Sequence, residues 1–82
     1  MVIDWYKNKI QAIDGVGHPI LRDASVTLGG YVASSYLGYI DAVELAKSLI
    51  SQNTYLQKGI SGYQKTAIQS INVGMSKPII FN

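Results

Sequence analysis

Apolar residues recur at helical spacing near the start of the chain. Val2, Tyr6, Ile10 and Ile13 follow one another at intervals of four, four and three residues, which is the spacing of one face of an α-helix. Asp4 suits the positive end of the dipole of such a helix. The pattern therefore predicts a short helix over residues 1–13.

A break follows this helix. Residues 14–19 read Asp-Gly-Val-Gly-His-Pro. Glycine tolerates backbone angles that other residues avoid, and proline cannot continue a helix that precedes it. The segment predicts a loop over residues 14–19. Pro19 could also open the next helix, since proline is favoured at the first helical position.

Residues 20–40 allow two interpretations. Gly29 and Gly30 separate residues 26–28 (Val-Thr-Leu) from residues 31–33 (Tyr-Val-Ala), and a two-residue glycine turn between such runs is typical of a β-hairpin. Alternatively, Gly29, Gly30 and Gly38 let another helix approach closely. We favour a helix over residues 20–40 because an isolated two-stranded hairpin is only marginally stable. A hairpin at residues 26–33 stays as the alternative.

The clearest periodicity lies between residues 41 and 74. At 100° per residue, seven apolar side chains fall within an arc of roughly 80°: Leu45, Leu49, Leu56, Ile60, Tyr63, Ala67 and Ile71. The stripe predicts one long amphipathic helix over 41–74. Each interior glycine costs about 1 kcal/mol relative to alanine, so this helix needs packing support or bends or breaks near Gly59. Gly74 is a plausible end for it, and Pro78 lies in an apolar, extended tail over residues 75–82.

Together these elements predict one small, mainly α domain over residues 1–82. Its one or two long helices are expected to form an extended or a hairpin arrangement. With 82 residues and no cysteine, the chain has a limited core and no disulfide to reinforce it. Oligomerisation is the remaining device that small chains commonly use.

Composition also favours burial against partners. Charged residues make up 15% of the chain, against about 25% in a typical soluble domain. The chain has six tyrosines, a residue that is enriched at protein interfaces because it joins a large apolar ring to a polar tip. These features indicate a subunit that contacts other copies of itself or neighbouring structural proteins.

The residues that could carry chemistry form no recognisable set. Ser34, Ser35 and Ser61 lack the glycine-framed turn and the base that a nucleophilic serine needs. Asp41 and Glu44 are three residues apart, a spacing that suits a helix start. The only histidine is His18. We therefore expect no enzyme, no catalytic residue, no cofactor, no metal and no small-molecule substrate.

Charge is divided unequally along the chain. Residues 1–44 hold five acids and three bases, whereas residues 45–82 hold four lysines and no acid. On one continuous helix Lys47, Lys58 and Lys65 would form a row about 27 Å long at 1.5 Å per residue. Such a row could contact nucleic-acid phosphates or anionic lipid, and a solvated helix face is the third interpretation.

The leading functional hypothesis is a structural subunit of a large assembly, such as a virion (coat or minor capsid) or filament component. The residues expected to pack against partners are Leu45, Leu49, Leu56, Ile60, Tyr63, Ile71, Gly29, Gly30 and Gly38. The alternative is a small membrane-associated or membrane-inserting helical protein. The N-terminus shows no secretory signal, because no basic segment precedes an apolar run. A virion or cell-surface location is favoured, although the sequence does not determine it.

Overall fold

The computed structural model describes residues 2–15 and 17–77 of the chain. Within these residues there are four α-helices, one short 3-10 helix and no strand. The elements are α1 (Val2–Gln11), α2 (Gly17–Ala33), α3 (Tyr39–Gln52), η1 (Leu56–Gly59) and α4 (Ile60–Met75). The prediction of a mainly α fold is confirmed.

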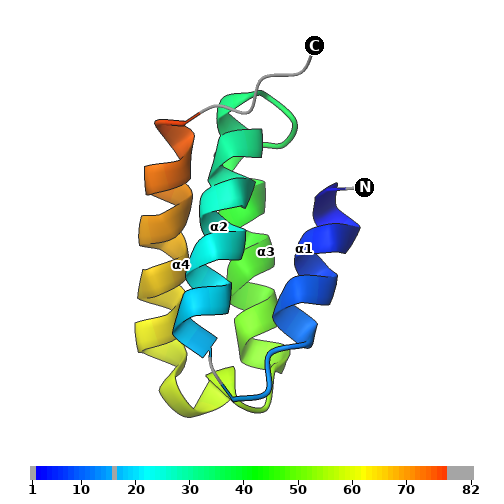
Figure 1. The fold of residues 1–82 in the computed structure, drawn as a ribbon, viewed down its shortest axis with the longest axis vertical. Helices are drawn as coiled ribbons and strands as arrows, with labels where there is room; N and C mark the ends of the chain where they lie inside the picture. The colour runs from blue at the N-terminus through cyan, green and yellow to red at the C-terminus, as the bar shows by residue number, and fades with distance from the viewer. Residues whose placement is uncertain (1, 16, 78–82) are drawn as a thin grey trace.

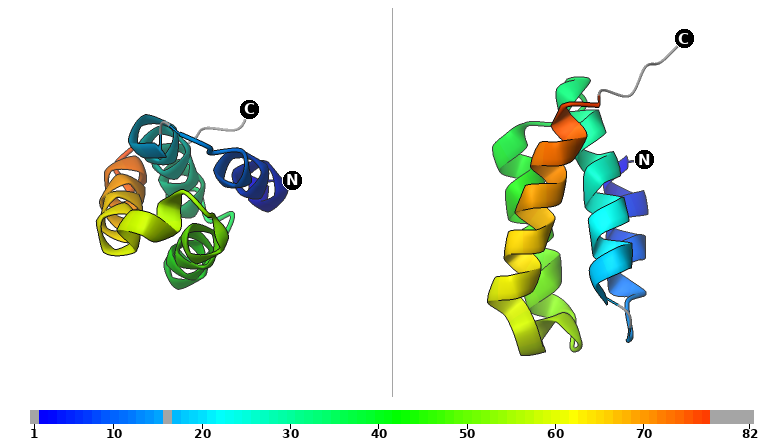
Figure 2. Two further views of the ribbon diagram at one scale, coloured as in Figure 1. Left: turned by 90° about the horizontal axis from the view of Figure 1, so that it is seen from below. Right: turned by 60° about the vertical axis from the view of Figure 1, so that its left-hand side comes forward.

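Consecutive helices run antiparallel, so the chain passes up and down the bundle (Figure 1). The helix α2 is central: it packs most extensively against α4 and also contacts α1 and α3. Seen along the bundle, α1 and α4 lie on opposite sides of α2 and α3 (Figure 2). The molecule measures about 38 × 21 × 20 Å. This arrangement places the start of α1, the end of α2 and the start of α3 at one end of the bundle.

Apolar side chains from every helix meet in one core within the chain itself. The buried members are Tyr6, Ile10, Ile13, Leu21, Ala24, Leu28, Ala42, Ala46, Leu49, Ile50, Leu56, Ala67 and Ile71. Burial of a leucine, isoleucine or valine side chain contributes about 1.5–3 kcal/mol each. The helical stripes seen in the sequence therefore face this internal core.

The β-hairpin alternative at residues 26–33 is wrong, because α2 continues as a helix through Gly29 and Gly30 to Ala33. Close helix packing is what Gly29 permits. Gly29 lies directly against the backbone of α4 at Ile71 and Gly74. Gly74 was expected to end the long helix, but α4 continues to Met75. Gly74 instead lies against the backbone of α2 at Val26 and Gly29.

The helix expected over residues 20–40 ends earlier than predicted. A turn at residues 34–38 separates α2 from α3, and Ser35 in this turn has a φ of 65°. The turn reverses the chain, so Tyr39 begins a new antiparallel helix. Gly38 is an exposed residue that precedes α3. It does not lie at a contact between two helices.

The single helix expected over residues 41–74 is also wrong, because α3 ends at Gln52 and α4 begins at Ile60. Asn53 causes the break. Its side-chain oxygen accepts hydrogen bonds from the backbone N–H groups of Tyr55 (2.9 Å) and Leu56 (3.1 Å). An asparagine that bonds nearby backbone groups in this way competes with helix formation. The sequence predicts a bend or break near Gly59. Gly59 has non-helical backbone angles and lies directly before α4, at the far end of the turn that begins at Asn53.

The remaining boundaries shift by a few residues. The helix expected over residues 1–13 is α1, and the loop expected at 14–19 is shorter because α2 begins at Gly17. Pro19 lies in the first turn of α2, where proline removes no helical hydrogen bond. The extended tail was expected over residues 75–82. Met75 belongs to α4, and residues 78–82 lie outside the described part of the chain.

Candidate functional site

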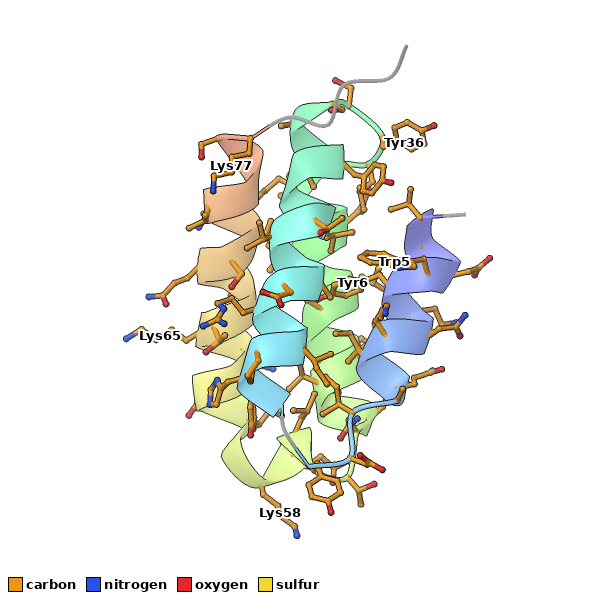
Figure 3. All side chains as sticks on the ribbon, viewed as in Figure 1. Trp5, Tyr6, Tyr36, Lys58, Lys65 and Lys77 are labelled. Carbon is orange, nitrogen blue, oxygen red and sulfur yellow. The ribbon has the colours of Figure 1, made fainter. Side chains whose placement is uncertain are left out.

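An aromatic groove runs between the first turn of α1 and the second half of α2, up to the end of the bundle where α2 turns into α3. Its volume is about 670 Å³. Three elements contribute the lining: the first turn of α1, the last turns of α2 and the 34–38 turn. The lining residues are Val2, Ile3, Trp5, Thr27, Tyr31, Tyr36 and Leu37. Figure 3 shows Trp5 beside α2 and Tyr36 at the turn above it.

The end of α2 fixes the two tyrosines of the groove. The N–H of Tyr36 donates to the carbonyl oxygen of Tyr31 (2.9 Å), and the N–H of Ser35 donates to that of Val32 (3.0 Å). With Ser35 at positive φ, these bonds form a Schellman motif, which often brings the flanking apolar side chains together. The rings of Tyr31 and Tyr36 meet edge to face at 5.5 Å between centroids. The helix cap thus shapes one wall of the groove.

The opposite wall is held by a buried hydrogen bond between α1 and α2. The Tyr6 hydroxyl lies 2.8 Å from the Ser25 hydroxyl, and both side chains are fully buried. Burial raises the pKa of Tyr6 above its ordinary value of 10.0, and the hydrogen bond with Ser25 opposes that rise. Trp5 lies next to this anchor, with its ring 6.5 Å from that of Tyr6. The anchor therefore sets the position of Trp5 against α2.

Large apolar side chains stand exposed around the same end of the bundle. Ile40 is 72% exposed, Tyr36 60% and Ile3 44%. Scattered apolar residues are common on protein surfaces, but a contiguous apolar area beside a groove is typical of an interaction site. The groove together with Tyr39 and Ile40 is called the aromatic end below.

Exposed acids lie near the aromatic end. Asp4 is exposed on the face of α1 opposite the lining residues Val2, Ile3 and Trp5. The carboxylate of Asp41, in the first turn of α3, lies beside Gly38, immediately after the lining residue Leu37. Lys77 stands at the same end of the bundle, just after α4 (Figure 3), so the charges there are mixed.

The opposite end of the bundle carries a rigid turn. The side-chain amide of Asn53 donates to the carbonyl oxygens of Ile10 (3.0 Å) and Ile13 (3.1 Å), which joins the turn to the end of α1. Leu56 anchors the turn in the core. Tyr55 and Lys58 project outward, with the lysine ammonium 5.7 Å from the tyrosine ring centroid. Residues 53–60 are called the basic turn below.

The structure places most residues that were expected to pack against partners inside the chain's own core. Leu49, Leu56, Ile71, Gly29 and Gly30 are buried within the bundle. The other members are half-buried or exposed: Leu45, Tyr63, Ile60 and Gly38. The buried members pack within the bundle, whereas Gly38 and Ile60 remain exposed on its surface.

The lysine row is divided by the break in the helix. Lys47 belongs to α3, Lys58 to η1 and Lys65 to α4, so the three side chains do not follow one another along a single rod. Figure 3 shows Lys58 at the tip of the basic turn and Lys65 on the outer side of α4. The regular spacing along phosphates that motivated a nucleic-acid or lipid contact depends on one continuous helix, which the chain does not form.

His18 contacts α4. Its ring packs against that of Tyr63 at 4.4 Å between centroids, and its Nδ1 lies 3.3 Å from the Thr66 hydroxyl. Among residues 2–15 and 17–77 no three histidine, cysteine or acidic side chains gather as a metal site would require. His18 therefore joins the first turn of α2 to α4.

Within the described part of the chain, no helix has the length and hydrophobicity that crossing a bilayer requires. Comparisons with protein families, with curated proteins and with solved structures give no match for this chain.

Periodicity did not identify the aromatic end. Trp5, Tyr31, Tyr36 and Leu37 come from three elements, and only the fold brings them together. Two signals in the sequence could have helped. The run from Ser34 to Gly38 is rich in turn-forming residues, and the abundance of tyrosine indicates a contact surface.

Proposed function

We propose that this chain is a non-enzymatic structural subunit of a larger assembly and that it contacts other copies through its aromatic end. The observation that carries the proposal is the groove of about 670 Å³ between α1 and the 34–38 turn. Its aromatic lining matches the residue types that dominate the centre of protein interfaces. Hydrogen bonds already hold both walls of the groove in place, so less conformational entropy is lost when a partner binds.

The lining of the groove favours a protein partner over anionic lipid. The described residues that line it include no lysine or arginine, and basic side chains are what the negative surface of an acidic membrane attracts. A virion or filament component would use such an end to bind its neighbours. Lys47, Lys58 and Lys65 lie on three different elements, so they do not support a phosphate-binding surface.

Sedimentation velocity over a range of protein concentrations tests the proposal. We expect the wild-type mass to rise above 8.9 kDa as concentration increases. Ile3→Ser should weaken this association about fivefold, because Ile3 lines the groove and is 44% exposed, and loss of an apolar side chain at a contact is expected to cost about 1 kcal/mol of binding. Val73→Ser is the matched control, since Val73 is 51% exposed on α4, which contributes nothing to the groove lining. A wild-type protein that stays monomeric at every concentration would refute self-assembly.

A further inference from the structure

The helix α4 ends at the same end of the bundle as the groove. It runs in the same direction as α2 (Figure 1) and ends at Met75, and Figure 3 shows Lys77 at the same end as Tyr36. The N–H of Lys77 donates to the carbonyl oxygen of Gly74 (2.9 Å). The chain therefore continues beyond Lys77 from a defined point near the upper end of the groove.

The sequence that follows Lys77 matches the apolar character of the groove. Residues 78–82 read Pro-Ile-Ile-Phe-Asn, with three large apolar side chains in succession and no charged residue. In the groove, Trp5 and Tyr31 are half-buried and Ile3 is 44% exposed. Apolar surfaces that meet leave water, which is favourable in proportion to the area removed. The proline has no N–H that an apolar groove would leave without a partner.

The groove lies within reach of these residues. The helix α2 contacts both α4 and α1, which lie on opposite sides of α2 and α3 (Figure 2). Axes of packed helices are about 8–10 Å apart, so a groove between α1 and α2 is about 12–15 Å from the axis of α4. The close approach of Gly29 and Gly74 places α4 directly against α2, which shortens this path. Five extended residues span about 17 Å, so residues 78–82 can cross the end of α2 and enter the groove.

We propose that residues 78–82 occupy the aromatic groove of their own chain and compete there with a second copy. The contact follows from the groove and the reach of the chain, and only the competition rests on the proposed function. A segment that is covalently linked within reach of its site has an effective concentration in roughly the millimolar range. At low protein concentration a second copy cannot match this value, so the segment reduces self-association.

Deletion of residues 78–82 tests the contact. Trp5 is the chain's only tryptophan and lines the groove, so its emission reports whether water reaches the groove. In the dilute monomer, deletion should shift this emission to the red, because the ring loses an apolar cover. Phe81→Ser keeps the length of the chain and should give part of the same shift. Asn82→Ser is the matched control, because it exchanges one polar side chain for another, and it should leave the emission unchanged.

A peptide with the sequence of residues 77–82 locates the contact. Added to the truncated protein, it should reverse the red shift in a saturable way. The intact chain should need at least about tenfold more peptide for any response, because its own segment already occupies the groove. In the truncated protein, Ile3→Ser should weaken peptide binding about fivefold, as loss of an apolar side chain at a contact does. Val73→Ser should leave it unchanged, since α4 does not contribute to the lining.

Two measurements separate this inference from the proposed function. The shift of Trp5 emission on deletion should be the same at every concentration at which sedimentation velocity shows a monomer, because the contact lies within one chain. Deletion should also lower the concentration at which copies associate by at least about threefold, because the groove is then free. If the emission shifts but neither protein ever associates, the contact stands and the proposed function is wrong.

Three results would overturn the contact. Emission that stays unchanged on deletion, in a protein whose circular dichroism shows intact helices, would place residues 78–82 away from the groove. A shift that appears only as concentration rises would assign the groove to the segment of a second copy. Weaker association after deletion would show that the segment joins copies and does not compete with them. If the truncated protein loses its helices, Phe81→Ser takes its place in each comparison.

Discussion

Gly29 of α2 and Gly74 of α4 face each other across a helix contact that has no room for a methyl group. A Cβ on Gly29 would lie 2.1 Å from the carbonyl oxygen of Ile71, and one on Gly74 would lie 1.9 Å from that of Val26. Both obstacles are backbone atoms, so no side-chain rotation could relieve them. The two helices therefore touch through their backbones, which explains why α2 and α4 form the most extensive packing in the bundle.

This contact predicts a large cost for Gly29→Ala. Separating two packed helices should lower the free energy of unfolding by about 1–3 kcal/mol or more. Gly62→Ala is the matched control, because nothing lies within 4 Å of the added Cβ and alanine favours a helix by about 1 kcal/mol over glycine. Urea unfolding should show opposite signs for the two variants. Equal effects at both positions would show that the close approach does not contribute to stability.

Removal of the buried hydroxyl at Tyr6 should destabilise the bundle. Tyr6→Phe leaves the Ser25 hydroxyl buried without its 2.8 Å partner, which costs about 1–3 kcal/mol. The double variant Tyr6→Phe with Ser25→Ala should cost less than the two single changes combined, because it removes both polar groups together. Thermal unfolding of the four proteins gives this coupling. Strict additivity would mean that the bond contributes nothing.

Stability should fall at high pH because of the same residue. Burial holds the pKa of Tyr6 above 10.0, with Ser25 opposing the shift. In the unfolded chain the tyrosine loses its proton near pH 10, whereas the folded chain retains it. The unfolded state therefore binds fewer protons, and the free energy of unfolding declines as pH rises above about 10. The difference in stability between wild type and Tyr6→Phe should shrink across this range, as measured by urea unfolding at pH 8 to 11.

Asn53→Ala should be more damaging than a polar surface change. It removes the side chain that bonds the N–H groups of Tyr55 and Leu56 and the carbonyl oxygens of Ile10 and Ile13. Leaving several buried groups without partners should cost about 2–4 kcal/mol, at about 1–3 kcal/mol for each group that water cannot reach. Asn72→Ala, on the exposed face of α4, is the control and should be nearly neutral. A small effect at Asn53 would show that the turn forms without its side chain.

Ser35 offers a stabilising change. Its φ of 65° lies in the left-handed region, which costs a non-glycine residue about 1–2 kcal/mol. Ser35→Gly should therefore raise the free energy of unfolding by up to about 1 kcal/mol, after allowing for the greater freedom of glycine in the unfolded chain. Ser34→Gly, at the neighbouring position, should not stabilise. If thermal unfolding showed Ser34→Gly to be more stable than Ser35→Gly, Ser35 would not be the strained position at the end of α2.

Local patterns in the sequence determined which segments are helical and which faces turn inward. The spacing of Val2, Tyr6, Ile10 and Ile13 predicts α1, and Tyr6, Ile10 and Ile13 are buried. The stripe that contains Leu49 and Ile71 is also buried. Such predictions succeed because amphipathic spacing depends on only one or two helical turns. Gly29 was likewise expected to allow close packing, and it does so against α4.

Helix ends and the candidate site depended on contacts between distant residues. Asn53 lies in a periodic stretch that reads as one helix. Its side-chain oxygen accepts from the N–H groups of Tyr55 and Leu56 after α3 ends, and its amide group holds this turn against the carbonyl oxygens of Ile10 and Ile13, 43 and 40 positions earlier in the sequence. The same fold divides Lys47, Lys58 and Lys65 and brings Trp5 to Tyr31 and Tyr36. Short-range periodicity thus determines the helices by itself. Where they stop, and which side chains they bring together, was decided only by the tertiary structure, since those choices are stabilised by long-range hydrogen bonds and packing.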